Sequence, residues 1–253
     1  MRDRDETPVP HEPAATPGTA APGAVSSPAA APSAPQTAPS SAAAPGRPVT
    51  GGEPAGPAVL EKSVHELGSA ATGSFHDPHT VLGAHPYRGA VTVRTLKPLA
   101  HRVEIVLPDG SAVPAEHEYD GIWRAVVEVE SLPRYTVRVT WAEGEAPVEI
   151  DDPYRFLPTL GELDLHLIRE GRHEELWRAL GSHVREVDGA AGTSFAVWAP
   201  RARAVQVVGD LNGWDGRAHA LRSLGESGVW EIFIPGVAEG AVYKYRILGA
   251  DGV

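Results

Sequence analysis

The sequence contains no cysteine, and that absence excludes several kinds of chemistry at once. Without thiols there is no disulfide framework, no cysteine nucleophile and no thiolate metal site. The chain also has no run of 18 apolar residues, about the length that a membrane-spanning helix needs. Its first residues are acidic and lead into no apolar stretch, so we expect no secretory signal. These absences favour a cytoplasmic protein with no membrane partner.

Basic residues are scarce compared with acidic ones. The 253 residues include 22 Lys and Arg but 33 Asp and Glu, for a formal net charge of −11. Binding to phosphate groups needs a basic face, so a nucleic-acid partner is not expected. Attachment to an anionic membrane surface is disfavoured for the same reason. The length allows one large domain or two small ones.

The first part of the chain differs in composition from everything after it. Residues 1–58 hold more than half of the 24 prolines and contain no Leu, Ile or aromatic residue. Such a segment buries too little apolar surface to offset its conformational entropy. We interpret it as a disordered, partly polyproline-like tail. A short helix is expected next, with Val64 and Leu67 on one face and Gly68 at its end.

Two regions in which apolar and polar residues alternate follow the tail. Within residues 59–160 and again within 187–253, short runs of this pattern are separated by turn residues. Short strands at regular spacing are typical of a β-sandwich or barrel. The predicted fold class is therefore all-β, with two tandem β-sandwich modules after the tail.

A helical connector is expected between the two modules, over residues 161–186. Good helix formers predict a helix at 172–180 that Gly181 ends, and a shorter helical turn at 162–168. Trp177 is expected to anchor this connector on one of the sandwiches.

The two strand regions can be aligned with each other as an internal repeat. The stretch "VRTLKPLAHRVEIVLPDG" matches "FAVWAPRARAVQVVGDLNG", and the offset drifts only from 102 residues (93 to 195) to 108 (135 to 243). The shared positions are Pro98 with Pro200, Trp123 with Trp230, and Tyr135 with Tyr243. Chance alignment of alternating strands is the alternative. The shared Pro, Trp and Tyr positions favour two copies of one module.

Two large side chains occur in only one copy. Trp214 aligns with about Ala112 of the first copy, and Lys244 aligns with Thr136. A side chain present in both copies is expected in the core, whereas one present in a single copy is a better candidate for function. The tryptophans expected in the core are Trp123, Trp198 and Trp230.

Five stretches of the sequence resemble those of a known family. The stretches "FAVWAP", "AVQVVGDLNGWDGRAHALR" and "GVWEIFIPGVAEGAVYKYRI" resemble the glycogen-binding module that precedes the catalytic barrel of α-glucan branching enzymes. They are also similar to the glucan-binding domain of the AMP-activated kinase β subunit. The stretches "FHDPHTVLGAHP" and "DDPYRFLPTLGELDLHLIREGRHEELWRALGSH" resemble the bacterial glycogen branching enzymes specifically. The resemblance covers residues 60–253 and implies immunoglobulin-like sandwiches.

The resemblance implies that the full-length protein is a 1,4-alpha-glucan branching enzyme, a glycosyltransferase of the α-amylase type. Such an enzyme cuts an α-1,4-glucan chain and rejoins the piece through an α-1,6 bond, using two carboxylates on a (β/α)₈ barrel. The chain ends at Val253 without that barrel, so we expect no catalytic residue and no activity in this segment. The implied partners are α-1,4-glucan (glycogen) and the downstream barrel of the same polypeptide. We expect a monomer with no cofactor and no metal.

The same resemblance implies a glucan-binding site at Trp214, Lys244 and Asn212. The aromatic ring would stack on the flat apolar face of a sugar, while polar groups bond its hydroxyls. A second aromatic of the kinase-type site falls at Val253, and its absence lowers the expected affinity. The alternatives are a stand-alone glucan-binding adaptor and a purely structural spacer in which Trp214 packs on its own hairpin.

Other polar clusters are expected to be structural. The histidine-rich loop supplies His76, Asp77, His79 and His85, a spacing that matches some metal sites. The resemblance explains this loop without a metal. General acid/base chemistry requires carboxylic acids, and five acidic residues could be proposed for it. We expect all five to be solvated instead. They are Asp109, Asp151, Asp152, Glu174 and Glu175.

Overall fold

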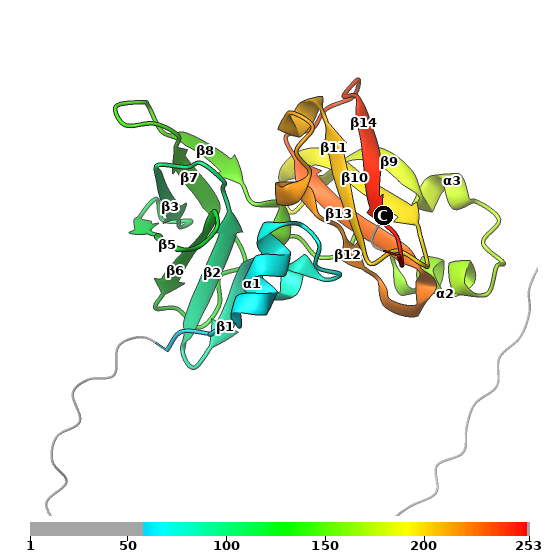
Figure 1. Cartoon of the computed structure of the whole chain (residues 1–253), viewed down its shortest axis with the longest axis horizontal. Helices are drawn as coiled ribbons and strands as arrows, with labels where there is room; N and C mark the ends of the chain where they lie inside the picture. The colour runs from blue at the N-terminus through cyan, green and yellow to red at the C-terminus, as the bar shows by residue number, and fades with distance from the viewer. Residues whose placement is uncertain (1–57, 252–253) are drawn as a thin grey trace, which may run out of the picture. The chain divides into compact units, whose positions relative to one another are not determined.

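A computed structural model describes residues 58–251 of the chain (Figure 1). The predicted tail, apart from its last residue, lies outside the described residues, and so does Val253. Between residues 58 and 251, no helix has the length and apolar character that crossing a membrane requires. The architecture is mostly β, in four antiparallel sheets with few helices, which confirms the predicted fold class.

Helix α1 (Val64–Ala71) begins one residue after Ser63 because that serine caps it. The Ser63 hydroxyl accepts a bond from the Glu66 N–H, and the Glu66 carboxylate accepts one from the Ser63 N–H. The bonds that the carboxylate accepts from the Ser63 N–H and from the Ser63 hydroxyl lower the pKa of Glu66 to about 2. The prediction that Gly68 ends the helix is wrong, since the helix runs on to a C-cap at Thr72.

The first module contains two four-stranded antiparallel sheets. One has the order β1-β2-β6-β5, with β1 Gly83–Tyr87, β2 Ala90–Leu96, β6 Ile122–Val127 and β5 Glu116–Tyr119. The other has the order β4-β3-β7-β8, with β4 Ala112–Pro114, β3 Arg102–Val106, β7 Thr136–Thr140 and β8 Val148–Asp151. Alternate apolar residues of β2, β3, β6 and β7 form a core of their own, which is the burial that the alternating pattern predicts.

The second module repeats this plan with fewer strands. One sheet has the order β12-β13-β10-β9, with β12 Arg222–Ser223, β13 Val229–Pro235, β10 Ala190–Trp198 and β9 Gly181–Val187. The other pairs β11 (Ala204–Gly209) with β14 (Tyr243–Leu248). Strand β9 occupies residues that the sequence assigned to the end of the helical connector.

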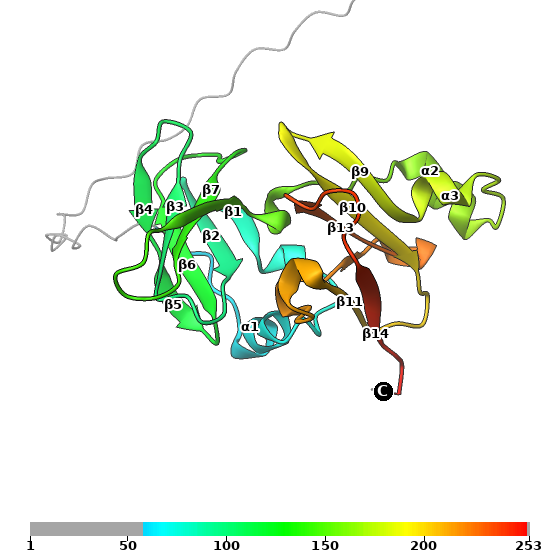
Figure 2. The same ribbon diagram turned by 90° about the horizontal axis from the view of Figure 1, so that it is seen from above.

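Two short helices lie beside β9 and β10 in both views (Figures 1 and 2). They are α2 (Glu162–Arg169) and α3 (Leu176–Ala179). The helix predicted at 172–180 is thus shorter than expected. The reason is the side chain of His173, whose Nδ1 accepts a bond from the Glu175 N–H and whose Nε2 bonds Asp164. These bonds fix residues 172–175 as a turn.

Short 3-10 helices mark the turns that position the polar side chains. They are η1 (Pro78–Thr80), η2 (Pro153–Arg155), η3 (Asp210–Asn212), η4 (Arg217–His219) and η5 (Gly225–Ser227). A hydrophobic cluster that includes Leu67, Leu82 and Tyr154 continues into Phe195 and Trp230 of the second module. Segments that precede and follow the first sandwich in the sequence therefore share a hydrophobic core with the second module.

The internal repeat is confirmed by strand pairing and by equivalent hydrogen bonds. Thr95 pairs with Trp123 in the first copy, as Val197 pairs with Trp230 in the second. The Trp123 indole donates to the Lys97 carbonyl oxygen at 3.3 Å, and the Trp230 indole donates to that of Ala199 at 3.0 Å. Lys97 and Ala199 are therefore equivalent positions in the two copies.

Two tryptophan predictions are wrong. Trp198, expected in the core, is 57% exposed, and Trp177, expected to anchor the connector, is 64% exposed. Trp198 is the last residue of β10, where its indole N–H donates to the Ser227 carbonyl oxygen at 3.2 Å and residues such as Ile168 and Leu176 of the α2–α3 segment line a pocket beside it. Alternation along a strand predicts which residues share a face but not whether another element covers the end of that face. Trp230, in contrast, is buried as expected.

The equivalent glycines Gly121 and Gly228 give a stability prediction. Both have positive φ, and an added Cβ would lie 2.9 Å from Pro98 in one copy and 2.8 Å from Pro200 in the other. Gly121→Ala and Gly228→Ala should each lower the free energy of unfolding by about 1–3 kcal/mol more than Gly89→Ala. Gly89 is the matched control, because its φ is also positive but nothing lies within 4 Å of an added Cβ. Denaturant unfolding measures the difference, and equal losses in all three variants would contradict the close approach.

Candidate functional site

The candidate site is built on the turn that follows strand β11. Gly209 ends the strand where any Cβ would collide with the backbone at Val242, so glycine is required there. The Trp214 N–H then donates to the Gly209 carbonyl oxygen at 2.9 Å, and the Asp215 N–H to that of Asn212 at 3.1 Å. Gly213 and Trp214 both have positive φ, +59° and +67°. The turn therefore places a tryptophan in a backbone conformation that disfavours bulky side chains.

The Trp214 ring is neither buried nor fully free. It is 41% exposed, and its indole N–H donates to the Asp210 carboxylate at 3.2 Å. The Arg246 guanidinium donates to the Trp214 carbonyl oxygen at 3.3 Å. The ring is thus held by its own turn and by β14, with part of its surface left in solvent.

Lys244 lies beside this ring, as the sequence-based hypothesis requires. Its position on β14 pairs with Val208 of β11, and its side chain points outward, whereas Tyr243 and Tyr245 are half-buried against the core. The Lys244 Nζ is 5.9 Å from the centroid of the Trp214 ring. That distance allows a cation–π contact and leaves the ammonium free to donate to a ligand.

Asn212 occupies a different role from the one that the sequence suggested. Its Oδ1 accepts a bond from the Gly209 N–H at 3.0 Å, while its Nδ2 donates to the Val207 carbonyl oxygen at 2.9 Å and to His219 Nδ1 at 3.0 Å. Both amide hydrogens are therefore engaged inside the turn. The structure places Asn212 under Trp214 as a clamp of the backbone rather than as an open donor.

His219 completes this polar network. Burial lowers its pKa to about 3, with a further contribution from the charge of Lys97 and an opposing one from Asp215. The imidazole is therefore neutral at physiological pH. Because the Asn212 amide can only donate to Nδ1, the proton of the neutral ring resides on Nε2.

One histidine of the histidine-rich loop packs against an aromatic ring. His79 is half-buried and lies edge-on against Tyr154, with ring centroids 5.0 Å apart, and desolvation lowers its pKa well below the usual value. Among residues 58–251, no group of three or more His, Cys, Asp or Glu side chains is arranged to hold a metal ion.

One acidic residue contradicts the expectation of a solvated turn. Asp152 is fully buried, and its carboxylate accepts bonds from the Tyr135 hydroxyl at 2.8 Å and the Tyr154 N–H at 3.2 Å. Burial raises its pKa, while Lys97 opposes that shift. The residue caps η2 and lies away from Trp214, so it serves the core rather than a reaction.

Acid should destabilise the fold through His219. Its folded-state pKa of about 3 lies below the ordinary histidine value of 6.5, so the unfolded state binds more protons between these values. Stability present above pH 6.5 is therefore lost as the pH falls toward 3, by up to about 1.4 kcal/mol per pH unit. Urea unfolding at a series of pH values should show a smaller slope for His219→Gln. The exposed His65→Gln is the control, and an unchanged slope in His219→Gln would contradict the assignment.

Comparison with known proteins gives two family matches along the chain. Residues 63–154 match the family described as alpha-1,4-glucan branching enzyme GlgB, N-terminal domain. Residues 179–253 match the family described as Carbohydrate-binding module 48 (Isoamylase N-terminal domain). The second match contains the Trp214 turn and Lys244.

Two branching-enzyme sequences and one solved structure illustrate what the chain is similar to. The 1,4-alpha-glucan branching enzyme GlgB of Leifsonia xyli subsp. xyli is 54% identical over 192 residues, which cover 74% of this chain and 26% of that protein. The protein of the same name from Rhodococcus jostii is 46% identical over 200 residues, covering 78% and 27%. A solved structure of the pullulanase from Paenibacillus barengoltzii, complexed with maltohexaose and alpha-cyclodextrin, aligns at 26% identity with a TM-score of 0.26, covering 36% of this chain and 16% of its own.

The chain spans about a quarter of the length of the curated relatives that it matches. Its two matched segments adjoin in one chain, the N-terminal domain first and the carbohydrate-binding module second. The chain is therefore similar, over about three quarters of its own length, to the N-terminal regions of 1,4-alpha-glucan branching enzymes.

Proposed function

We propose that the second module binds α-1,4-glucan on the platform formed by Trp214 and Lys244. The observation that carries this proposal is a partly exposed tryptophan, held in a left-handed conformation, with a lysine ammonium 5.9 Å from its ring. A flat indole complements the apolar face of a glucose unit, and an ammonium donates to the hydroxyls at its rim. The match to a carbohydrate-binding module supports the same ligand class.

The neighbouring residues orient this platform. The Asp210 carboxylate bonds the indole N–H, which fixes the rotation of the ring. Asn212 holds the turn below it and acts on the ligand only through the position of Trp214. A binding platform that is already ordered loses little side-chain entropy when it meets a sugar.

We propose further that this chain is the N-terminal part of a 1,4-alpha-glucan branching enzyme that acts in the cytoplasm as a monomer without a cofactor. Residues 58–251 form β modules and short helices and include no (β/α)₈ barrel. The paired carboxylates that retaining transfer needs would lie in the remaining part of such a protein. In this proposal the modules of this chain, with the second beginning at β9, position that barrel and hold its polymeric substrate.

Activity assays test the enzymatic part of the proposal. Sequencing beyond the codon for Val253 should give a barrel-encoding extension, and the protein expressed from it should form α-1,6 branches in amylose. The chain of 253 residues alone should form none. An extension that lacks a barrel would support a stand-alone adaptor instead.

Removal of the aromatic ring should abolish most glucan binding. Trp214→Ala is expected to raise the Kd for maltohexaose about tenfold to a hundredfold, the range expected for loss of 1–3 kcal/mol of stacking. Isothermal titration of the full chain measures the change. Trp177→Ala is the matched control, because it removes an exposed tryptophan far from this turn in the sequence and should bind as the wild type does. Unaltered affinity in Trp214→Ala would support the structural-spacer alternative.

Substitutions of Lys244 and Asn212 should distinguish effects on glucan binding from effects on stability. Lys244→Met removes an exposed charge, so it should weaken maltohexaose binding severalfold and leave the unfolding free energy within about 0.5 kcal/mol. Asn212→Ala leaves the Gly209 N–H and Val207 carbonyl without their side-chain partner, so it should cost about 1–3 kcal/mol of stability. Urea unfolding and titration of each variant measure both quantities. The reverse pattern would show Asn212 as the direct ligand contact.

A further inference from the structure

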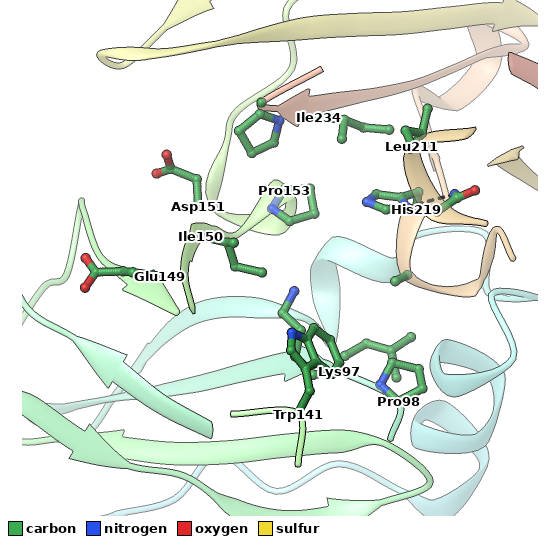
Figure 3. Close-up of a pocket in the computed structure, with 15 residues that line it drawn as sticks. Lys97, Pro98, Trp141, Glu149, Ile150, Asp151, Pro153, Leu211, His219 and Ile234 are labelled. Carbon is green, nitrogen blue, oxygen red and sulfur yellow. Dashed lines mark hydrogen bonds between the residues drawn. The ribbon is translucent and has the colours of Figure 1, made fainter. Parts of the chain in front are cut away.

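A hollow of about 600 Å³, shown in Figure 3, has Asn212 and His219 among its lining residues. Its lining comes from the end of β2, from β8 and from the residue after β7, together with η4 and the end of β13. Trp214 is not part of the lining. The volume falls in the range of small-molecule binding sites.

Lys97 points into this hollow with its ammonium group (Figure 3). The side chain is only 8% exposed, and the described residues include no hydrogen-bond or ion-pair partner of its Nζ. Burial lowers the pKa of Lys97, and the charge of Asp152 opposes that shift. The equivalent residue of the second copy is Ala199, so the shared sandwich framework does not require a lysine here.

Trp141 forms a wall of the same hollow beside Lys97 (Figure 3). It is 43% exposed although it is a large apolar side chain. The carbonyl of Thr140 accepts from the His101 N–H just as that of Leu248 accepts from the Arg203 N–H. Trp141 therefore aligns with Gly249, and this tryptophan, like Lys97, occurs in the first copy alone.

The remaining polar groups of the hollow complement a ligand that both donates and accepts hydrogen bonds. The Nε2–H of His219, whose other ring nitrogen bonds Asn212, is a donor on the wall opposite Trp141 (Figure 3). Asp151 supplies an acceptor, because Arg155 bonds only its Oδ1 and leaves Oδ2 open. Glu149 lies at the same rim, where its Oε1 accepts from the Thr136 hydroxyl at 2.6 Å and its Oε2 from Arg138 at 3.2 Å. Ile150 and Pro153 add apolar surface between these groups.

This combination selects the chemistry of the ligand. An anion would meet two carboxylates on a chain of net charge −11, and a purely apolar molecule would leave Lys97 buried without a partner. A neutral sugar ring has an apolar face for Trp141 and hydroxyls for the donors and acceptors. We infer that this hollow is a second α-glucan-binding site, separate from the Trp214 platform. The ligand class rests on the proposed function, whereas the location rests on Lys97 and Trp141.

Indole resonances test the two sites separately in one experiment. The chain has 6 tryptophans, so ¹⁵N-labelled full chain gives 6 indole signals, each assignable by substitution. Titration with maltohexaose should shift the Trp141 signal in the wild type and in Trp214→Ala. The Trp177 signal, on an exposed ring outside both sites, should not move. Inorganic phosphate at the same concentrations should leave the Trp141 signal unchanged.

Substitutions in the hollow should then weaken this site alone. Lys97→Met is expected to raise the Kd read at the Trp141 signal about tenfold or more, as for loss of a hydrogen bond to a charged group. The Kd read at the Trp214 signal should stay unchanged. Because Lys97 is buried, Trp141→Ala provides a second variant that alters an exposed side chain, and it should remove one of two binding events in calorimetry.

Each possible failure has a distinct signature. A Trp141 signal that stays fixed while the Trp214 signal moves would overturn the second site and leave the proposed function intact. A Trp141 shift that occurs only when Trp214 is present would assign the effect to the first site and overturn this inference as well. If phosphate moves the Trp141 signal and maltohexaose does not, the site binds an anion instead of a sugar.

Discussion

The side-chain amide of Asn212 is the constraint on which both candidate sites depend. Its oxygen must face the Gly209 N–H, so its nitrogen faces the Val207 carbonyl and His219. The first two bonds close the turn that carries Trp214. The third fixes the tautomer of His219 and so makes its Nε2 a donor toward the hollow. One amide thus sets the position of an aromatic ring on one side and the polarity of a wall on the other.

Comparison of the two copies distinguishes the residues that build each sandwich from the candidate functional residues, which neither copy allows alone. The indole bonds of Trp123 and Trp230, and the glycines that pass close to Pro98 and Pro200, recur because the same strand crossing must close in each sandwich. The side chains without a counterpart gather around two surfaces. Trp214 and Lys244 form one, and the other has Lys97 and Trp141. The packing contacts are thus the same in the two copies, whereas these surface positions differ.

The fold and the first site followed from local sequence patterns. Alternation predicted the strands, and the alignment of the copies brought attention to Trp214 and Lys244, which the pairing of β11 with β14 places side by side. Asp152 and Lys97 escaped prediction because their burial is decided by elements distant in sequence. The prediction that Trp198 is buried was wrong for a different reason. The strand pattern suggested that another element covers its side chain, but the short α2–α3 segment leaves it exposed.

The backbone at Trp214 argues that its position is retained for a purpose beyond folding. Three two-residue hairpin turns in residues 58–251 also have positive φ at both central residues: Arg88–Gly89, Asp120–Gly121 and Asp188–Gly189. Each has glycine second, where a side chain is most costly. The Gly213–Trp214 turn reverses that order and accepts a strain of roughly 1–2 kcal/mol. Exchanging the two residues would leave the tryptophan at a positive φ of 59° and would move the indole away from Lys244, so the observed order is the one that keeps the ring and the ammonium together.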